Sequence, residues 1–327
     1  MMAPMEGITT ATYRRIYKKH FSGVDVFFTP FLVANQTHKF KHREKNEFQP
    51  FDEDLVPQLL TNSVEDFIWG AKELKSAGYN EINFNLGCPA STVVTKKKGA
   101  GMLSDTDRLI RFFDEIFDVK EKENLPDISV KTRIGMTDIS ETEDLAEIYP
   151  KYPFSEVIIH PRLRSDFYEG QPRMEQFDLL YSAIRNGAAS KRTRIIYNGD
   201  IYDVNDYQRI MECYPDIDGI MMGRGLIIDP LLTEKIRGIE NGRVKERIYA
   251  FINELYDAYS EILSGERDVL FKMKDIAMYM TLNLPENAKV RKVIKKARNR
   301  EEYMLCRRNF SRQVAYIIGM CYCVRSF

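Results

Sequence analysis

The sequence predicts an α/β fold, namely a (β/α)₈ barrel of the TIM type followed by a small all-helical domain. Eight short apolar runs recur along the first 240 of the 327 residues, and stretches of helical spacing separate them. Polar residues stand where these runs end, as they do at the mouth of a barrel, whereas an open doubly wound sheet would gather them at one crevice. Beyond residue 240 only helical periodicity remains.

The expected elements are short and regular. Strands are expected at 1–4, 24–28, 56–60, 81–86, 128–134, 156–160, 194–198 and 218–222. Helices are expected at 10–20, 64–77, 105–119, 140–151, 174–187 and 203–213, and Asp229-Pro begins another. In the tail, helices fit 248–263, 268–282, 286–298 and 301–324. We therefore expect a barrel domain over 1–240 and a helical domain over 241–327.

Bulk composition narrows the class of protein. With 44% hydrophobic and 29% charged residues, the chain can bury a large core. The net charge is zero, so affinity for nucleic acid would have to come from a local cluster of basic residues. No run of 18 apolar residues occurs, and the N-terminal residues do not resemble a signal peptide. We expect a monomeric cytoplasmic protein without a membrane partner, in which the five cysteines are free thiols.

The segment 81–90, Glu-Ile-Asn-Phe-Asn-Leu-Gly-Cys-Pro-Ala, dominates the expected barrel. Its apolar residues alternate with polar ones until Gly87 and Pro89 end the strand around a lone thiol, Cys88. Most free cysteines are small core residues, but this one lies in a loop at a strand end. There, a barrel presents nucleophiles and acids, and the motif leaves open which of these Cys88 is.

Other strand ends carry further polar groups. Lys131 lies within an apolar strand, where an unpaired charge is costly, so it should face an anion or an electron-rich ring. Arg133 is expected to point toward the helices as a structural ion-pair partner. His160 ends the next strand, and with Arg162 two residues on, ligand contact is expected for both.

Two glycine-bearing loops follow the last two strands. They contain Asn198, Gly199 and Asp200 in one case and Gly223 and Arg224 in the other. In barrels, these two loops commonly bind phosphate through backbone N–H groups, and Arg224 would add a bidentate charge. Two ordinary glycine turns are the alternative.

Basic residues gather in two places. His38 and His42 are spaced like metal ligands, but four lysines and arginines surround them, which indicates a solvated basic segment. Residues 289–300 carry seven basic residues and no acidic one around an apolar stripe. Such a run is usually a solvated helix face, yet without compensating acids it favours contact with a phosphate backbone, in which Lys292, Lys295 and Lys296 take part.

Taken together, the motifs resemble the tRNA-dihydrouridine synthase family. The matching stretches cover most of the first 240 residues in order, and they are Ala3-Pro-Met-Glu-Gly-Ile-Thr, Val56-Pro-Gln-Leu, Asn85-Leu-Gly-Cys-Pro, Gly99-Ala-Gly-Met-Leu, Val130-Lys-Thr-Arg-Ile-Gly, His160-Pro-Arg, Tyr197-Asn-Gly-Asp-Ile and Met222-Gly-Arg-Gly. The tail resembles the family's RNA-binding domain more loosely. The chain differs from the family where Pro161 replaces a frequent glycine.

The resemblance implies reduction of uridine in tRNA to 5,6-dihydrouridine, with FMN as cofactor and NADPH as reductant. It places Pro4, Met5, Gln58, Lys131 and His160 around the flavin ring, and Asn198, Gly199, Asp200, Gly223 and Arg224 at its phosphate tail. Asn85 would hold the uracil. Hydride would pass from flavin N5 to C6, and the Cys88 thiol would protonate C5. Two other functions remain open, a flavin barrel that reduces a small alkene or pyrimidine and an RNA-binding protein with an idle barrel.

Overall fold

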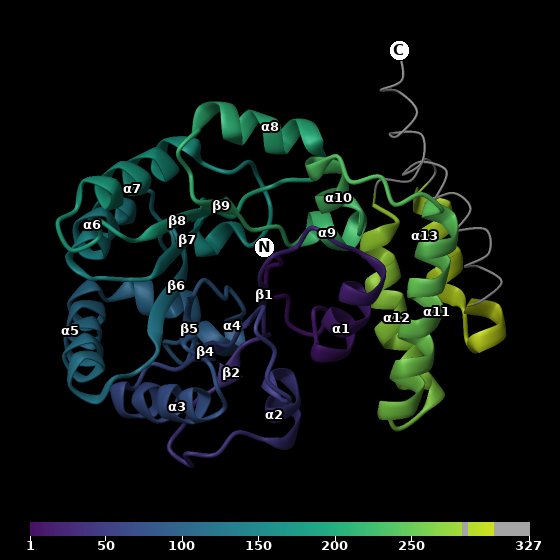
Figure 1. Ribbon diagram of the computed structural model, residues 1–327, viewed down its shortest axis with the longest axis horizontal. Coiled ribbons are helices and arrows are strands. Elements are labelled where there is room, and N and C mark those ends of the chain that lie inside the picture. Colours follow the sequence, from purple (N-terminus) through teal and green to yellow (C-terminus); the bar gives the residue numbers. More distant parts are fainter. Residues whose placement is uncertain (283–286, 304–327) are drawn as a thin grey trace. The chain divides into compact units, whose positions relative to one another are not determined.

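The protein is described by a computed structural model that covers residues 1–282 and 287–303 (Figure 1). The chain forms two compact units that interleave along the sequence. The first comprises Met1–Pro4, Asp25–Asp200 and Met211–Met222, and the second contains Met5–Val24, Ile201–Ile210 and the residues from Gly223 onward. The single division expected at residue 240 stays a prediction.

The first unit is built on parallel strands. One pair joins β1 (Phe27–Phe28) to β3 (Leu55–Val56). The larger sheet has the order β2-β4-β5-β6-β7-β8-β9. Its strands are β2 (Leu32–Val33), β4 (Gln58–Leu60), β5 (Glu81–Leu86), β6 (Asp127–Arg133), β7 (Glu156–His160), β8 (Arg194–Tyr197) and β9 (Gly219–Ile220).

Residue Met2 closes the sheet into a barrel. It forms parallel bridges to Phe27 on one side and to Met222 on the other. The Ala3 N–H donates to the Met222 carbonyl at 2.8 Å, and the Met2 N–H donates to the Val26 carbonyl at 2.9 Å. The first strand is thus reduced to one bridging residue between the strands on either side. The predicted (β/α)₈ barrel is confirmed.

Helices cover the outside of the strands, as Figure 1 shows for α3, α5, α6 and α7. The helices of the first unit are α2 (His42–Phe48), α3 (Val64–Ser76), α4 (Ser91–Val94), α5 (Thr106–Glu123), α6 (Glu141–Ile148) and α7 (Met174–Asn186). Helix α8 (Val204–Cys213) belongs in part to each unit, with residues up to Ile210 in the second. Short 3₁₀ turns occur at Gly99–Ser104, Tyr149–Lys151 and Arg164–Asp166. Where β5 meets α3 and α5, the rings of Phe84, Phe67 and Phe112 pack at centroid distances of 5.0–5.8 Å.

Inward-facing side chains fill the barrel. The side chains of Phe28, Ile158, Ile196 and Met221 form a dry cluster with Ala3. Beside it runs a ladder of buried amides. The Gln58 Nε2 donates to Asn83 Oδ1 at 2.7 Å, and Asn83 Nδ2 donates to Ser129 Oγ at 3.0 Å. Because these polar groups bond to one another, they can be buried without a large desolvation cost.

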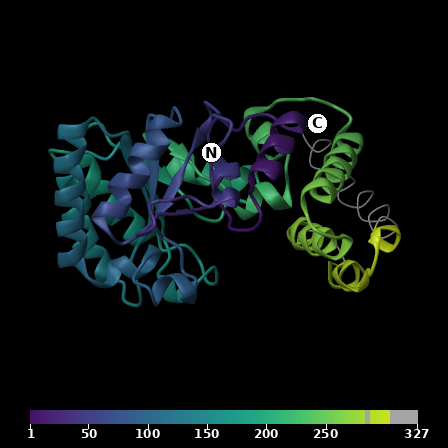
Figure 2. The ribbon, with the colours of Figure 1, turned by 90° about the horizontal axis from the view of Figure 1, so that it is seen from below.

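The second unit is helical. It contains α1 (Ala11–His20), α9 (Arg224–Ile228), α10 (Leu232–Arg237), α11 (Val244–Ile262), α12 (Glu266–Met280) and α13 (Asn287–Lys296). Helix α1, drawn in purple, packs on α11 (Figure 1, Figure 2). The Phe251 ring lies 5.6 Å from that of Tyr13 and 5.0 Å from that of Phe21. These aromatic contacts fix α1 against the helices that follow the barrel in sequence.

Several elements differ from the sequence prediction. The expected third strand is divided into β3 and β4 at Pro57, which has no N–H to donate to a neighbouring strand. The short helices α2 and α9 were not expected. Most of the helix expected at 301–324 lies outside the described residues, as do Cys306, Cys321 and Cys323. No helix in the described part of the chain is both long and apolar enough to cross a membrane.

Candidate active site

Four predicted site residues meet at the carboxyl edge of the barrel. Asn85 and Lys131 pair in register on β5 and β6, His160 ends β7, and Asn198 follows β8. The N–H of Asn198 donates to the Ile159 carbonyl at 2.9 Å, which continues the ladder past the end of β8. Carboxyl ends of parallel strands point to one mouth, so the barrel brings together groups that are far apart in sequence.

The loop that bears Cys88 is held by the Asn85 side chain. Its Oδ1 accepts from the N–H of Gly87 at 3.1 Å and from the N–H of Cys88 at 2.9 Å. Its Nδ2 donates to Gln58 Oε1 at 2.7 Å. The amide of Asn85 therefore connects the turn before Cys88 to the buried amide ladder inside the barrel. These bonds fix the backbone from which the half-buried thiol projects.

Arg133 binds the same loop from the other side. It is buried, and its guanidinium donates to the carbonyls of Gly87 at 2.9 Å, Leu163 at 2.7 Å and Phe167 at 2.6 Å. The sequence prediction for Arg133 was wrong. Strand side chains alternate with a period of two, so Arg133 shares the face of Lys131, and its guanidinium donates to carbonyls instead of carboxylates.

Two further contacts complete the loop. Arg164 Nε donates to the Pro89 carbonyl at 3.1 Å. On the far side, Gly99 has φ +56°, and an added Cβ there would lie 3.1 Å from the Cβ of Cys88. The stretch after the thiol therefore needs glycine both for its backbone and for its close approach to Cys88. Sequence reasoning missed Arg164, because nothing local links it to Pro89.

Lys131 lies inside the mouth beside this loop. Burial, and after it the nearby positive charge of Arg133, lower the pKa of Lys131 to about 7, although Cys88 opposes the shift. An anion placed at the mouth would favour the charged form and raise this pKa again. The protonation of Lys131 should therefore depend on whether a negatively charged ligand is bound.

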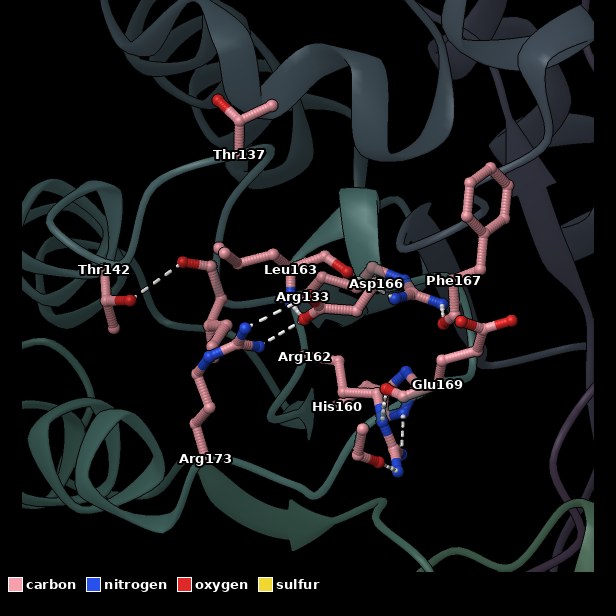
Figure 3. A network of polar contacts seen from close by, with 12 residues as sticks. Arg133, Thr137, Thr142, His160, Arg162, Leu163, Asp166, Phe167, Glu169 and Arg173 are labelled. Atoms are coloured by element: carbon pink, nitrogen blue, oxygen red, sulfur yellow. Dashed lines mark hydrogen bonds and ion pairs between the residues drawn. The ribbon is translucent and has the colours of Figure 1, made fainter.

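Arg162 is fully buried in the network drawn in Figure 3. Its Nη1 donates to His160 Nε2 at 3.2 Å and to Asp200 Oδ1 at 3.1 Å, and its Nη2 also bonds Asp200 Oδ2. The carbonyls of Glu169 and Gly170 accept from Nε and Nη2. Every N–H of this guanidinium has a protein acceptor, which favours a positioning role over direct ligand contact.

The contact with Arg162 also fixes the state of His160. A guanidinium can only donate, so His160 Nε2 must accept, and the imidazole is neutral with its proton on Nδ1. The turn at Pro161 makes this contact possible, because the Arg162 N–H donates to the His160 carbonyl at 2.7 Å and folds the chain back. His160 is thereby prepared as an N–H donor.

The loop after β7 is held by hydrogen bonds and an ion pair. We refer to residues 163–168 as the 163–168 loop. Its Asp166 carboxylate accepts from the Leu163 N–H at 2.8 Å and from Arg173 Nη2 at 3.1 Å (Figure 3). Hydrogen bonding to Arg173 lowers the pKa of Asp166 although partial burial opposes the shift. An ion pair therefore closes the loop at its base.

The residues expected at a phosphate belong to both units. In the first unit, Asn198 Nδ2 donates to the Met221 carbonyl at 2.8 Å, and Gly199 lies against Tyr197, whose hydroxyl would clash with an added Cβ. In the second unit, Gly223 precedes α9, and the guanidinium of Arg224 lies over the Tyr202 ring at 5.5 Å. Their phosphate contact stays a prediction.

The remaining predicted residues are placed as follows. Pro4 ends the barrel's N-terminal segment, and in the second unit the Met5 N–H donates to Thr9 Oγ1 at 2.8 Å. Lys292, Lys295 and Lys296 are exposed on α13, whose Ile294 is buried. Ala297 of the expected apolar stripe is also buried, but Val293 is 52% exposed, so the expected separation of a charged face from an apolar one is confirmed only in part.

In the described part of the chain, no three His, Cys, Asp or Glu residues gather in a way that could hold a metal ion. The prediction of a solvated segment was wrong for His38. Its ring stacks on Trp69 at 5.4 Å, and its Nε2 lies 3.3 Å from the buried carboxylate of Asp66. An aromatic neighbour close in space holds this histidine, which the local charge pattern did not reveal.

Comparison with known proteins identifies related sequences. The family model described as dihydrouridine synthase matches residues 1–315. A probable tRNA-dihydrouridine synthase of Staphylococcus aureus (strain COL) is 30% identical over 244 residues, which cover 72% of this chain and 70% of that protein. A probable tRNA-dihydrouridine synthase 2 of Bacillus subtilis (strain 168) is 26% identical over 265 residues, covering 80% and 79%. Among solved structures, morphinone reductase matches with a TM-score of 0.48 and 13% identity, over 72% of this chain and 84% of that one.

Proposed function

The chain belongs to the dihydrouridine synthase family, and we propose that it is a flavoprotein that reduces uridine in tRNA to 5,6-dihydrouridine, with FMN as cofactor and NADPH as reductant. The observation that supports this reaction best is the fixed loop at Cys88. Its thiol is half-buried at the carboxyl edge of the barrel, beside Lys131 and Asn85. A positioned proton donor next to a cation suits reduction of a polarised double bond.

The mouth suits a flat anionic cofactor. Lys131 is the cation there, and because burial lowers its pKa to about 7, an anion at the mouth would favour its charged form. Below it, the apolar cluster and the amide ladder close the barrel, so a ring would rest across the mouth. We propose that the ring contacts Pro4, Met5, Gln58, Lys131 and His160, and that the phosphate contacts Asn198, Gly199, Asp200, Gly223 and Arg224.

When bound, FMN supplies a hydride to C6 of the uracil. The chain's own residues then have separate tasks. Cys88 gives its proton to C5, and Asn85 holds both the uracil and the backbone of the thiol loop. Lys131 offsets negative charge at the ring, while Arg162 keeps His160 in its N–H-donating tautomer. Arg162 thus supports the site through His160.

The basic face of α13 makes tRNA the proposed partner. Each lysine that neutralises a phosphate releases counterions, so binding should weaken steeply as salt increases. We expect that replacing Lys292, Lys295 and Lys296 by glutamine lowers the slope of log K against log[salt] by about 1 per lysine. Lys72, Lys120 and Lys122 form ion pairs on the barrel helices, and a triple glutamine variant there is the matched control. A slope equal to that of the wild type would contradict the assignment.

A direct assay tests the whole proposal. Purified protein, FMN and NADPH are incubated with an unmodified tRNA transcript, and dihydrouridine is measured position by position. We expect dihydrouridine in the transcript but no turnover of free uridine, uracil or simple alkenes. Turnover of a small molecule with no dihydrouridine in RNA would favour the alternative, a barrel oxidoreductase acting on an alkene or pyrimidine. A monomeric state and cytoplasmic localisation stay predictions.

A further inference from the structure

We propose that Phe167 binds RNA, and that its phenyl ring stacks on an unpaired nucleobase next to the uridine that reacts. This inference rests on the proposed function and adds a contact to it. Phe167 lies in the 163–168 loop, and 44% of its surface is exposed. In Figure 3, its ring points away from the polar network that holds its backbone. A large aromatic side chain so placed presents a π face to a ligand.

The backbone of Phe167 is unusual for an aromatic residue. Its φ is +52°, in the left-handed region that favours glycine. This conformation costs a phenylalanine conformational free energy. Burial of the ring does not offset that cost, because the ring is exposed. Strained non-glycine residues gather at binding sites and active sites, where the surrounding structure over-determines them.

The surroundings of Phe167 over-determine it in this way. Its carbonyl accepts from Arg133 at 2.6 Å, and its N–H donates to the Arg164 carbonyl at 3.1 Å. The N–H groups of Arg164 and Ser165 donate to the carbonyls of Gly135 and Met136, both at 2.9 Å. The exposed ring therefore stands on a fixed backbone, which lowers the conformational entropy that a ligand contact must overcome.

The same arginines bind the thiol loop. Arg133 donates to the carbonyl of Gly87, before Cys88, and Arg164 donates to the carbonyl of Pro89, after it. The 163–168 loop and the thiol loop are thus joined on both sides of the reactive sulfur. A base stacked on Phe167 would be held at a fixed distance from Cys88, which points to a nucleotide close to the target uridine.

The aromatic ring of Phe167 and the positive charge of Arg164 suit a nucleobase as the ligand. The Arg164 guanidinium lies over the Phe167 ring at 4.9 Å, so a cation accompanies the aromatic surface. A uridine that enters an enclosed site must leave its stack, which exposes the faces of its neighbours. Such bases bind aromatic side chains irrespective of sequence, and an adjacent arginine can reach the phosphate.

Kinetics test the proposal. We expect Phe167→Leu to raise KM for tRNA about tenfold with little change in kcat, because stacking contributes binding that does not change in the transition state. Phe167→Tyr keeps the ring and should behave as the wild type. Phe51→Leu is the matched control, since Phe51 is 53% exposed at the opposite, amino edge of the barrel. Equal KM values for Phe167→Leu and the wild type would overturn the proposal.

Fluorescence tests the stacking itself. The chain has one tryptophan, Trp69, so Trp69→Phe gives a background without indole emission. In that background, Phe167→Trp should lose emission when unmodified tRNA is added, and Phe51→Trp should not. Quenching by an added protein extract freed of RNA, with none by tRNA, would assign the surface to a protein partner and refute the inference.

The two proposals can fail separately. If the wild type forms no dihydrouridine in tRNA, the proposed function falls. If it does and the Phe167→Leu variant matches it in KM while Phe167→Trp emission is unaffected by tRNA, the function stands and only the role of Phe167 falls. Leu and Tyr carry the same backbone strain as Phe at φ +52°, so a difference in KM between the two variants reports on the ring and not on the backbone, and circular dichroism of Phe167→Leu shows whether it is folded.

Discussion

The two edges of the barrel treat buried charge in opposite ways. At the carboxyl edge, Arg133 and Arg162 are buried and bonded to carbonyls and to Asp200. At the amino edge, Glu156 is fully buried, and neither of its carboxylate oxygens has a hydrogen-bond partner among the described residues. An ion-pair contact at 3.2 Å joins it to Arg194. Burial, together with the nearby carboxylate of Glu81, raises the pKa of Glu156 to about 8, although Arg194 opposes the shift.

This difference in buried charge corresponds to a difference in role between the carboxyl and amino edges. The arginines at the carboxyl edge stay charged because carbonyls of three loop segments satisfy them, and in return they fix those loops around Cys88. The carboxyl at the amino edge holds no loop and becomes neutral instead. At Arg133 and Arg162 the buried charge is thus satisfied by the groups that it positions, whereas the pKa of Glu156 shifts toward the protonated form.

The largest expected effect concerns Cys88. We expect Cys88→Ala to lower kcat for tRNA reduction by about 10² to 10⁴, because it removes a general acid. Flavin binding and flavin reduction by NADPH should remain, as followed by absorbance. The matched control is Cys213→Ala, which removes an exposed thiol. Wild-type turnover by Cys88→Ala would show that the carboxyl edge does not act through this sulfur.

Next comes Arg133, which we expect to act by holding the thiol loop. Arg133→Lys keeps the charge but cannot reach three carbonyls in a fixed geometry. We expect kcat to fall about 10- to 100-fold and the rate of Cys88 alkylation by iodoacetamide to change. Arg185→Lys is the control, since Arg185 donates to the Asp216 carbonyl at 2.7 Å away from the mouth. Unchanged kcat and alkylation would separate Arg133 from the thiol.

The amino edge gives a prediction about stability. The native pKa of Glu156 lies near 8 and its unfolded value near 4.5, so the wild type loses stability as pH rises between these values. We expect Glu156→Gln to raise the free energy of unfolding by about 2 kcal/mol at pH 9, and the gain to shrink toward pH 5. Denaturant unfolding measures it, with exposed Glu147→Gln as control. A gain independent of pH would mean that Glu156 is not neutral in the fold.

The smallest expected effect concerns Lys131. Its contribution to stability changes with pH in the opposite direction to that of Glu156. Its native pKa near 7 lies below its unfolded value near 10.5, so the flavin-free wild type gains stability as pH rises from 7 to 10.5. We expect Lys131→Met to raise the free energy of unfolding of flavin-free protein by about 1 kcal/mol at pH 6 and less at pH 10. Calorimetry without flavin measures it. A constant difference would show that the mouth does not desolvate Lys131.

The sequence by itself determined the barrel and its mouth. Period-two alternation and the residues at the strand ends placed Asn85, Lys131 and His160 at one edge, because strand geometry is local and parallel strands share a direction. The same periodicity, applied consistently, would also have placed Arg133 on the face of Lys131.

Only the tertiary structure decided how the site is held. Arg133 reaches Gly87 across 46 residues, and Arg164 reaches Pro89 across 75. The pairing of Arg162 with Asp200 and the packing of α1 on α11 likewise join distant segments. Such contacts leave no periodic trace in the sequence, because they depend on where loops and helices meet after the barrel has closed. The chemistry is thus encoded locally, and its positioning arises only in the folded chain.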